Sequence, residues 1–316
     1  SVRDIFGIGS VGIVTARDDF ALAHSAEDLW NRVRDLASID IEKLRAKYVL
    51  GRDTRDWSVA MSQADVLFDG PNRDFIRTVQ YRPFDQRMTY FTVRSRGFLS
   101  YPREDIWNRL GGGNLSLITS RFTKGEDFAH AMVSEGMVEK IALSSKTSNN
   151  AFIFPLLLDA QSEAENLTPA FRDFLDDRYG EHYDPEQILG YIYAVLHAPT
   201  YRTRYAEFLR IDFPRIPFAE TPEQFEALSV LGWELIQTHL LKTVPRSDPR
   251  LGDYVGKCDH TIEAVRYSPQ EQTVWINKTQ GFANLPQSVW DFHIGGYQVI
   301  DKYLKSRKGR VLNLDE

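Results

Sequence analysis

The chain has 316 residues and a formal net charge of −6, with 42% hydrophobic and 26% charged residues. These values are typical of a globular chain that forms one large domain or two smaller lobes. A single cysteine, Cys258, excludes an internal disulfide, so we expect a cytoplasmic protein. The longest apolar run, residues 151–158, is about a third of a bilayer span, so no membrane role is expected. Because the chain starts at Ser1 without a methionine, we expect it to be part of a longer polypeptide.

The first part of the chain, residues 1–158, is predicted to be a strand-rich lobe. A helix over residues 25–36, opened by Ser25, is the exception. Strands are expected where short β-branched and aromatic runs lie between turn residues, at 89–93, 114–122, 140–145 and 150–158.

The second part, residues 159–316, is predicted to be largely helical. Three helices share one start signal, a capping side chain directly before a proline, at Thr168, Asp184 and Thr221. Pro199 interrupts the apolar stripe of the second of these, which predicts two helices that meet at a bend. A late strand at 273–276 and a basic helix over 295–310 complete an α+β fold.

Charge is distributed unevenly along the chain. Residues 71–124 hold ten basic side chains, nine of them arginine, against four acidic ones, whereas residues 159–187 hold nine acids against two arginines. Arginine donates in pairs to phosphate or guanine and stacks on flat rings, so the first segment indicates nucleic-acid binding. A solvated sheet face is the alternative interpretation.

Sequence motifs for chemistry are largely missing. GIGSVG at residues 7–12 has dinucleotide-site spacing, but the residues that follow predict a strand or turn instead of a helix. Cys258 and His260 form a close soft-ligand pair without a second pair at zinc-site spacing, so no metal is expected. The Asn/Asp-Pro-Pro-aromatic loop of amino-directed methyltransferases is missing, because no proline has a proline neighbour. We therefore expect no catalytic residue and no enzyme activity in this chain alone.

Several long blocks resemble one known family. They are YRPFDQRMTYF at 81–91, YPR at 101–103, and residues 189–218, 231–241 and 289–310. These blocks are similar to the C-terminal target-recognition region of type ISP single-chain restriction-modification enzymes. The resemblance extends from about Phe6 to Arg310.

The resemblance implies a domain that reads double-stranded DNA and positions a target adenine for N6-methylation by a preceding methyltransferase domain. It implies S-adenosylmethionine, ATP and Mg²⁺ in the parent enzyme and no cofactor in this chain. Double-stranded DNA and the intramolecular methyltransferase domain are the expected partners. A lobe that packs on the methyltransferase or translocase without reading bases remains the alternative.

The expected site residues fall into two groups. In residues 82–85 we expect Pro83 to stiffen a turn, Phe84 to anchor it in the core, and Asp85 to pair with Arg82 or Arg87. The group expected to contact phosphate or act as scaffold is Arg82, Asp85, Arg87, Arg103, Lys305, Arg307, Lys308 and Arg310. The group expected to read bases is Arg94, Arg96, Asn108, Arg109, Asn114, Arg121, Lys124, Lys146, Asn149 and Asn150.

Overall fold

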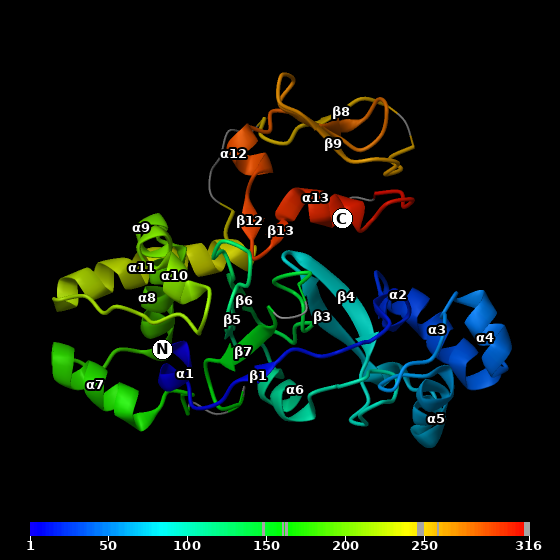
Figure 1. The fold of residues 1–316 in the computed structure, drawn as a ribbon, viewed down its shortest axis with the longest axis horizontal. Coiled ribbons are helices and arrows are strands. Elements are labelled where there is room, and N and C mark those ends of the chain that lie inside the picture. The colour runs from blue at the N-terminus through cyan, green and yellow to red at the C-terminus, as the bar shows by residue number, and fades with distance from the viewer. Residues whose placement is uncertain (147–148, 160, 162–163, 245–249, 258, 313–316) are drawn as a thin grey trace.

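A computed structural model describes residues 1–146, 149–159, 161, 164–244, 250–257 and 259–312. Helices and antiparallel sheets are both present, which confirms the predicted α+β class. Figure 1 shows four parts, which we name the hairpin lobe (residues 18–90), the central sheet, the helical lobe (169–239) and the cap (250–312). Within the described residues, no helix combines the length and apolar character that crossing a membrane requires.

The hairpin lobe packs helices against a small sheet. Its helices are α2 (Asp18–Ala21), α3 (Ala26–Ser38), α4 (Ile41–Lys47) and α5 (Val59–Asp69), and a short 3₁₀ helix covers Arg73–Phe75. Its strands, in the order β2-β4-β3, are Leu22–Ala23, Asp85–Tyr90 and Ile76–Arg82. The predicted helix at 25–36 is confirmed as α3, and the Ser25 hydroxyl accepts from the backbone of Asp28 at 3.1 Å. Strand β4 ends at Tyr90, so the predicted strand at 89–93 is right only at its start.

The β3–β4 hairpin turns sharply at Pro83-Phe84, because Arg82 pairs directly with Asp85. Pro83 is buried, as expected for a stiff turn. Phe84 has a φ of +59° and is only half-buried, so it is not the full core anchor that we expected. At the tip of a hairpin the ring reaches the edge of the core instead of its interior.

The central sheet divides the interior into two cores. Its strands, in the order β1-β7-β5-β6, are Ser10–Val11, Ala151–Pro155, Ser116–Ser120 and Ala131–Ser134. Ile118 and Ile153 face the core shared with the hairpin lobe, whereas the adjacent Leu117 and Phe154 face the core shared with the helical lobe. Successive side chains of a strand point to opposite faces, so all three long strands are buried. The predicted strands at 114–122 and 150–158 are confirmed as β5 and β7.

The predicted strand at 140–145 is wrong, because these residues form turns. Ala142 and Leu143 are buried, so their apolar character reflects turns packed on the core. The GIGSVG segment contains β1, and Ile13 and Val14 after it form β-bridges as predicted, but the short helix α2 already begins at Asp18. A side chain at Gly9 would meet the Phe154 ring at 2.5 Å and one at Gly12 the Val138 carbonyl at 2.4 Å, so these glycines allow close packing.

Two short helices precede strands of the central sheet in the sequence. They are α1 (Val2–Ile5), before β1, and α6 (Glu104–Leu110), before β5. The helical lobe consists of α7 (Pro169–Tyr179), α8 (Pro185–His197), α9 (Pro199–Arg204), α10 (Ala206–Leu209) and α11 (Pro222–His239). Its three predicted starts are confirmed, with Thr168, Asp184 and Thr221 as N-caps, and α8 and α9 are separate helices on either side of Ala198.

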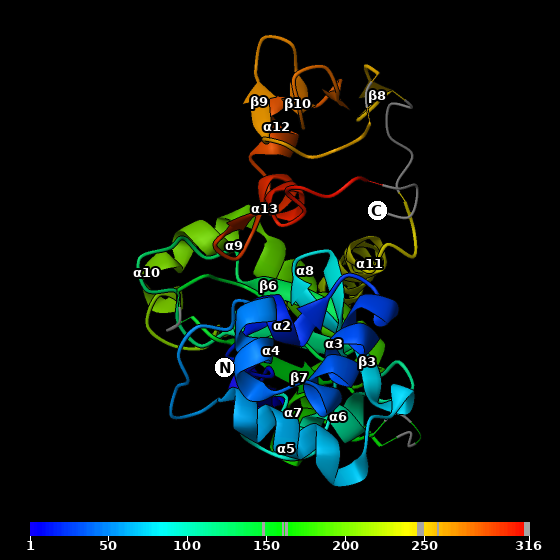
Figure 2. The same ribbon diagram turned by 90° about the vertical axis from the view of Figure 1, so that its right-hand side faces the viewer.

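The cap makes the second half less helical than predicted. Its strands are β8 (Tyr254–Val255), β9 (Arg266–Ser268), β10 (Thr273–Trp275), β11 (Gly281–Phe282), β12 (His293–Ile294) and β13 (Tyr297–Gln298), and its helices are α12 (Gln287–Trp290) and α13 (Val299–Lys305). The predicted late strand is confirmed as β10, but the predicted helix over 295–310 is reduced to α13. Ile262, Val274 and Ile276 form a separate small core, and the cap stands above the rest of the fold in both views (Figure 2).

Candidate nucleic-acid interface

Arg82, the first arginine of the hairpin turn, is buried inside the fold. Its Nη1 atom donates to Glu139 Oε2 at 2.7 Å, its Nη2 atom lies 3.4 Å from Asp18 Oδ2, and its guanidinium stacks 3.7 Å from the Tyr81 ring. The Arg82 side chain is 4% exposed. Arg82 therefore belongs to the scaffold and has no surface to offer to a phosphate.

Asp85 is the centre of a second buried charge cluster. Arg87 donates to both of its oxygens at 2.8 Å, which confirms one of the two pairings expected for Asp85. Arg307, from the cap, donates to Asp85 Oδ1 at 3.1 Å. Burial opposes ionisation of Asp85, but the bonds and charges of Arg87 and Arg307 outweigh it and lower the carboxyl pKa. This cluster joins the hairpin to the cap.

Two further titratable groups lie against these clusters. Burial raises the pKa of Glu139 to about 7, although Arg82 acts in the opposite direction. The pKa of His24 is lowered to about 3, first by burial and then by the charges of Arg87, Arg310 and Arg307. Arg87 Nη1 lies 2.5 Å from His24 Nε2, and arginine only donates, so His24 accepts through this nitrogen as a neutral ring.

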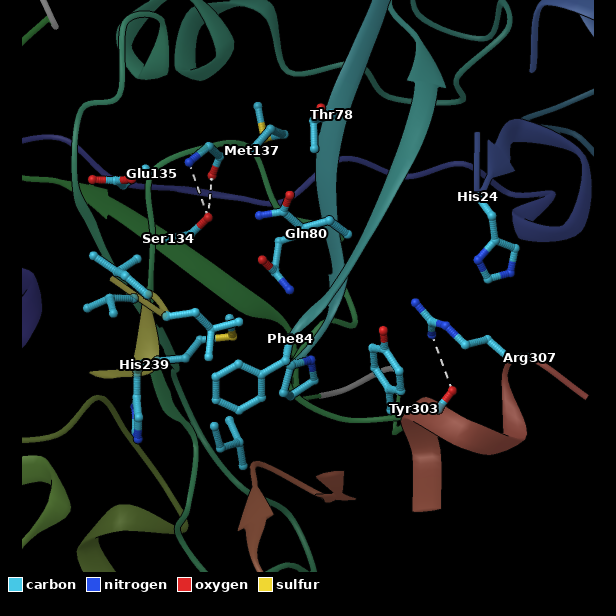
Figure 3. Close-up of a pocket in the computed structure, with 18 of the residues that line it drawn as sticks. His24, Thr78, Gln80, Phe84, Ser134, Glu135, Met137, His239, Tyr303 and Arg307 are labelled. Atoms are coloured by element: carbon cyan, nitrogen blue, oxygen red, sulfur yellow. Dashed lines mark hydrogen bonds between the residues drawn. The ribbon is translucent and has the colours of Figure 1, made fainter. Parts of the chain in front are cut away.

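A cleft of about 680 Å³ opens beside these clusters, between the hairpin tip and the cap (Figure 3). The polar side chains on its wall include His24, Gln80, Gln86, Arg307 and Arg310. Apolar groups complete the lining, among them Phe84, Leu240, Leu241 and Ile294. Parts of the chain more than 200 residues apart thus build one concave surface.

The cap also carries cations close in sequence to the residues that line this cleft. Lys305 and Lys308 are exposed, and Arg310 is half-buried and lines the cleft. Lys305 forms an ordinary helix-surface pair with Asp301 at 2.8 Å. Of the four basic residues expected here, three thus remain near the surface, while Arg307 is internal.

Arg94 and Arg96, expected to read bases, follow the end of β4. Arg94 bridges two carboxylates of α5, Asp65 at 3.2 Å and Asp69 at 2.6 Å. The side chain of Arg96 is half-exposed and lies 3.7 Å from Asp56. Helix α5 lies at the lower edge of the molecule and α13 well above it in both views (Figures 1 and 2), so these arginines are not brought together with the cap cations.

The next group of expected residues surrounds α6. Arg103 adopts a left-handed backbone at the start of this helix, and its guanidinium lies 5.4 Å from the Tyr101 ring. The Asn114 amide donates to the carbonyls of Arg109 and Leu157 and accepts from the Leu157 backbone, so it is engaged inside the fold. Arg109 donates to the Leu158 carbonyl at 2.8 Å. In this group Asn108 is exposed.

The remaining expected residues lie in the loops between residues 121 and 150. Glu126 ties part of these loops together, because it accepts from His130, Ser144 and Asn149 at 2.7 to 3.0 Å. Burial opposes ionisation of Glu126, but these three hydrogen bonds lower its pKa to about 2. Asn149 is fully buried by this arrangement.

The cations of the same loops lie further out. Arg121 is exposed and pairs with Asp212 at 3.2 Å, and Lys124 is exposed. Lys146 donates to the Gly125 carbonyl at 2.9 Å, and Asn150 is half-buried. Thr147 and Ser148, between the expected base readers Lys146 and Asn149, lie outside the described residues.

Sequence reasoning missed the carboxylates that organise these cations. Asp65 accepts from Thr92 at 2.6 Å and from the Phe98 backbone at 2.7 Å, in addition to Arg94. The arginine partners of Asp65 and Glu139 lie 29 and 57 residues away, and the partners of Glu126 lie 4 to 23 residues away. No local sequence pattern identifies these carboxylates as partners of the cations. The arginine-rich segment was therefore predicted to expose more positive charge than it does in the structure.

The described residues contain no group of three or more His, Cys, Asp or Glu side chains that could hold a metal ion. Cys258, half of the soft-ligand pair considered above, lies outside the described part of the chain.

Comparisons with known proteins agree on one class. A family model described as the Type ISP C-terminal specificity domain matches residues 4–316, whereas no curated protein matches. A cryoEM structure of a DrdV-DNA complex has a TM-score of 0.73 at 22% identity over 96% of this chain. A nuclease-deletion mutant of the Type ISP enzyme LlaGI, in complex with a DNA substrate mimic, has a TM-score of 0.68 at 19% identity over 98% of this chain.

A third structure, the ATP-dependent Type ISP enzyme LlaBIII bound to DNA, has a TM-score of 0.70 at 17% identity over 96% of this chain. At these identities the likeness shows a shared fold. The chain spans 31%, 29% and 20% of the length of these three neighbours, respectively.

Proposed function

Because the chain belongs to the Type ISP C-terminal specificity domain family, we propose that it reads a duplex DNA sequence within a restriction-modification polypeptide. The observation that carries this proposal is the match over nearly the whole chain, together with a fold shared with DNA-bound Type ISP enzymes. The chain has a specificity role and supplies no catalytic group.

The finer proposal concerns the chemistry that this recognition serves. The domain holds the duplex so that one adenine leaves the stack and enters a preceding methyltransferase domain, which transfers a methyl group to N6. S-adenosylmethionine, ATP and Mg²⁺ bind in that polypeptide outside this chain. Such an enzyme acts on DNA in the cytoplasm.

The side chains that we assign to DNA lie in separate parts of the surface, the cap cations and the exposed loop residues. Lys305, Lys308 and Arg310 contact phosphates, since phosphate contacts fix the register of the protein on the duplex. The expected base readers that remain accessible are Arg96, Asn108, Arg121, Lys124 and Lys146. Arg82, Asp85, Arg87 and Arg307 act as scaffold, because their side chains are buried and paired with one another or with Glu139.

Fluorescence anisotropy with labelled duplexes at several salt concentrations tests the proposal. Binding through several cations should weaken steeply as salt rises, with a slope of about −0.9 for each phosphate contacted. A protein-interaction lobe would show weak binding with no sequence preference and little salt dependence. Selection from a pool of random duplexes then identifies the sequence, and adenine methylation by the complete polypeptide on that sequence tests the finer proposal.

A further inference from the structure

The cleft between the hairpin tip and the cap has two walls of different chemistry (Figure 3). Arg307 and Arg310 line the wall formed by the cap. Glu135 is the sole carboxylate among the described residues that line the cleft, and it is paired with Lys242. Arg87 and Arg307 share the single carboxylate of Asp85, and Arg310 adds a further cation, so the described groups around the cleft carry surplus positive charge, which favours an anionic ligand.

His24 adds a neutral polar group to this basic wall. Its Nε2 atom accepts from Arg87, so the proton of the neutral ring is on Nδ1. Burial, and then the charges of the surrounding guanidinium groups, lower the pKa of the ring and keep it neutral. A phosphate brought to this wall meets charged donors and gains charge-assisted hydrogen bonds.

Phe84 supplies an aromatic surface in the same cleft. Its φ of +59° lies in the left-handed region, where the third position of a turn that begins Arg82-Pro83 is normally glycine or asparagine. The ring is half-buried, and its centroid lies 6.0 Å from that of His239, with the two planes perpendicular. In known proteins, residues other than glycine with strained backbone conformations occur often at ligand-binding sites.

We propose that this cleft binds one unpaired nucleotide of DNA, with the phosphate at Arg310 and the base against Phe84. The volume of about 680 Å³ lies within the range of about 300 to 1,000 Å³ typical of small-ligand sites. Base–aromatic stacking and arginine–phosphate contact are the two interactions that single-stranded nucleic acid uses most. The inference rests on the proposed function, because extrusion of the target adenine into the methyltransferase domain leaves the nucleotide opposite it unpaired, and an aromatic ring stacks on any base.

Free mononucleotides share this chemistry, so the experiment separates the two sources. Anisotropy would compare a labelled duplex that contains one unpaired adenosine with the fully paired duplex of the same sequence. We expect the unpaired adenosine to increase affinity roughly tenfold, as stacking and phosphate contact together predict. Competition with dAMP, with inorganic phosphate as its control, shows whether a free nucleotide also enters the cleft.

Two variants localise the effect. Phe84→Gly suits the positive φ, which offsets part of the packing that the half-buried ring loses, so we expect a folded protein that has lost the tenfold preference. Arg310→Gln should also reduce the preference. Arg266→Gln is the charge-matched control, since Arg266 is exposed on β9 and does not line the cleft, and it should keep the preference.

Equal affinities for the bulged and paired duplexes would overturn the inference and leave the proposed function standing. A preference retained by Phe84→Gly would overturn it as well. If the unaltered chain bound no duplex at all, that result would contradict the proposed function itself. Displacement by dAMP but not by phosphate would support the site and extend it to free nucleotides.

Discussion

Arg307 Nη2 lies 3.1 Å from Asp85 Oδ1, although 222 residues of chain separate the two. The side chains are 5% and 1% exposed, so this contact is fully internal. Asp85 also pairs with Arg87, so one carboxylate binds an arginine of the hairpin and an arginine of the cap. The relative position of the two parts that border the cleft therefore depends on a buried charge cluster.

Loss of this carboxylate should destabilise the fold. Asp85→Asn leaves two buried guanidinium groups without their counterion, and we expect a cost of about 3 to 5 kcal/mol in the free energy of unfolding. Urea unfolding followed by circular dichroism measures it. Glu207→Gln is the control, because Glu207 pairs with Arg210 at an 84% exposed position and should cost about 0.5 kcal/mol or less. Similar costs for the two variants would show that the cluster adds no stability.

The arginines and lysines should separate by their effect on salt dependence. Lys308→Gln should weaken binding to all duplexes alike and reduce the salt slope by about one charge. Arg82→Gln should instead lower the melting temperature, because Glu139 loses its buried partner. Anisotropy at five salt concentrations and thermal unfolding report the two effects. If Arg82→Gln left the melting temperature unchanged but reduced the salt dependence of DNA binding, Arg82 would have to contact DNA.

Arg96 is the accessible candidate for base reading near the end of β4. Arg96→Ala should reduce discrimination at one base pair by about 1 to 3 kcal/mol and leave the other positions unchanged. Adenine methylation by the complete polypeptide, on the selected duplex and its single base-pair variants, measures this. Arg94→Ala is the comparison, since Arg94 is bound to Asp65 and Asp69 and its loss should act on stability first. Uniform rates on all duplexes for Arg96→Ala would remove it from the readers.

Glu126 should make stability depend on acid pH. Its pKa in the folded protein is about 2, below the ordinary 4.5, so its contribution is complete above pH 4.5 and disappears as the pH falls toward 2. A shift of this size corresponds to about 3 kcal/mol at most. Urea unfolding from pH 7 to pH 3 should show Glu126→Gln less stable at pH 7, with a gap that narrows in acid. Asp127→Asn, at a 99% exposed side chain, should show no such change.

The contact between α8 and α11 should not tolerate larger residues. A side-chain carbon at Gly232 would lie 1.8 Å from the Gly190 carbonyl oxygen, so the helices must separate to accommodate it. We expect Gly232→Ala to lower the free energy of unfolding by about 1 to 3 kcal/mol, although alanine favours helix over glycine. Glu234→Ala, at an exposed position of the same helix, is the control. A Gly232→Ala protein as stable as the parent would show that α8 and α11 can separate at this contact without cost.

The sequence by itself determined the features that depend on neighbouring residues. A capping side chain before proline defined the starts of α7, α8 and α11, because both parts of the signal lie within one helical turn. Short β-branched and aromatic runs between turn residues predicted β5 and β7, and long matching blocks predicted the Type ISP specificity family that the comparisons show.

Only the tertiary structure decided which charges reach the surface. Arg82, Arg87 and Arg307 looked like DNA contacts in the sequence, but Glu139 and Asp85 neutralise them in the interior. The choice of partner for a charged group depends on which distant segments fold against it, and burial then makes that pairing obligatory, since an uncompensated charge inside a protein is costly. The cleft beside Phe84 has the same origin, because its walls come from the hairpin, α11 and the cap.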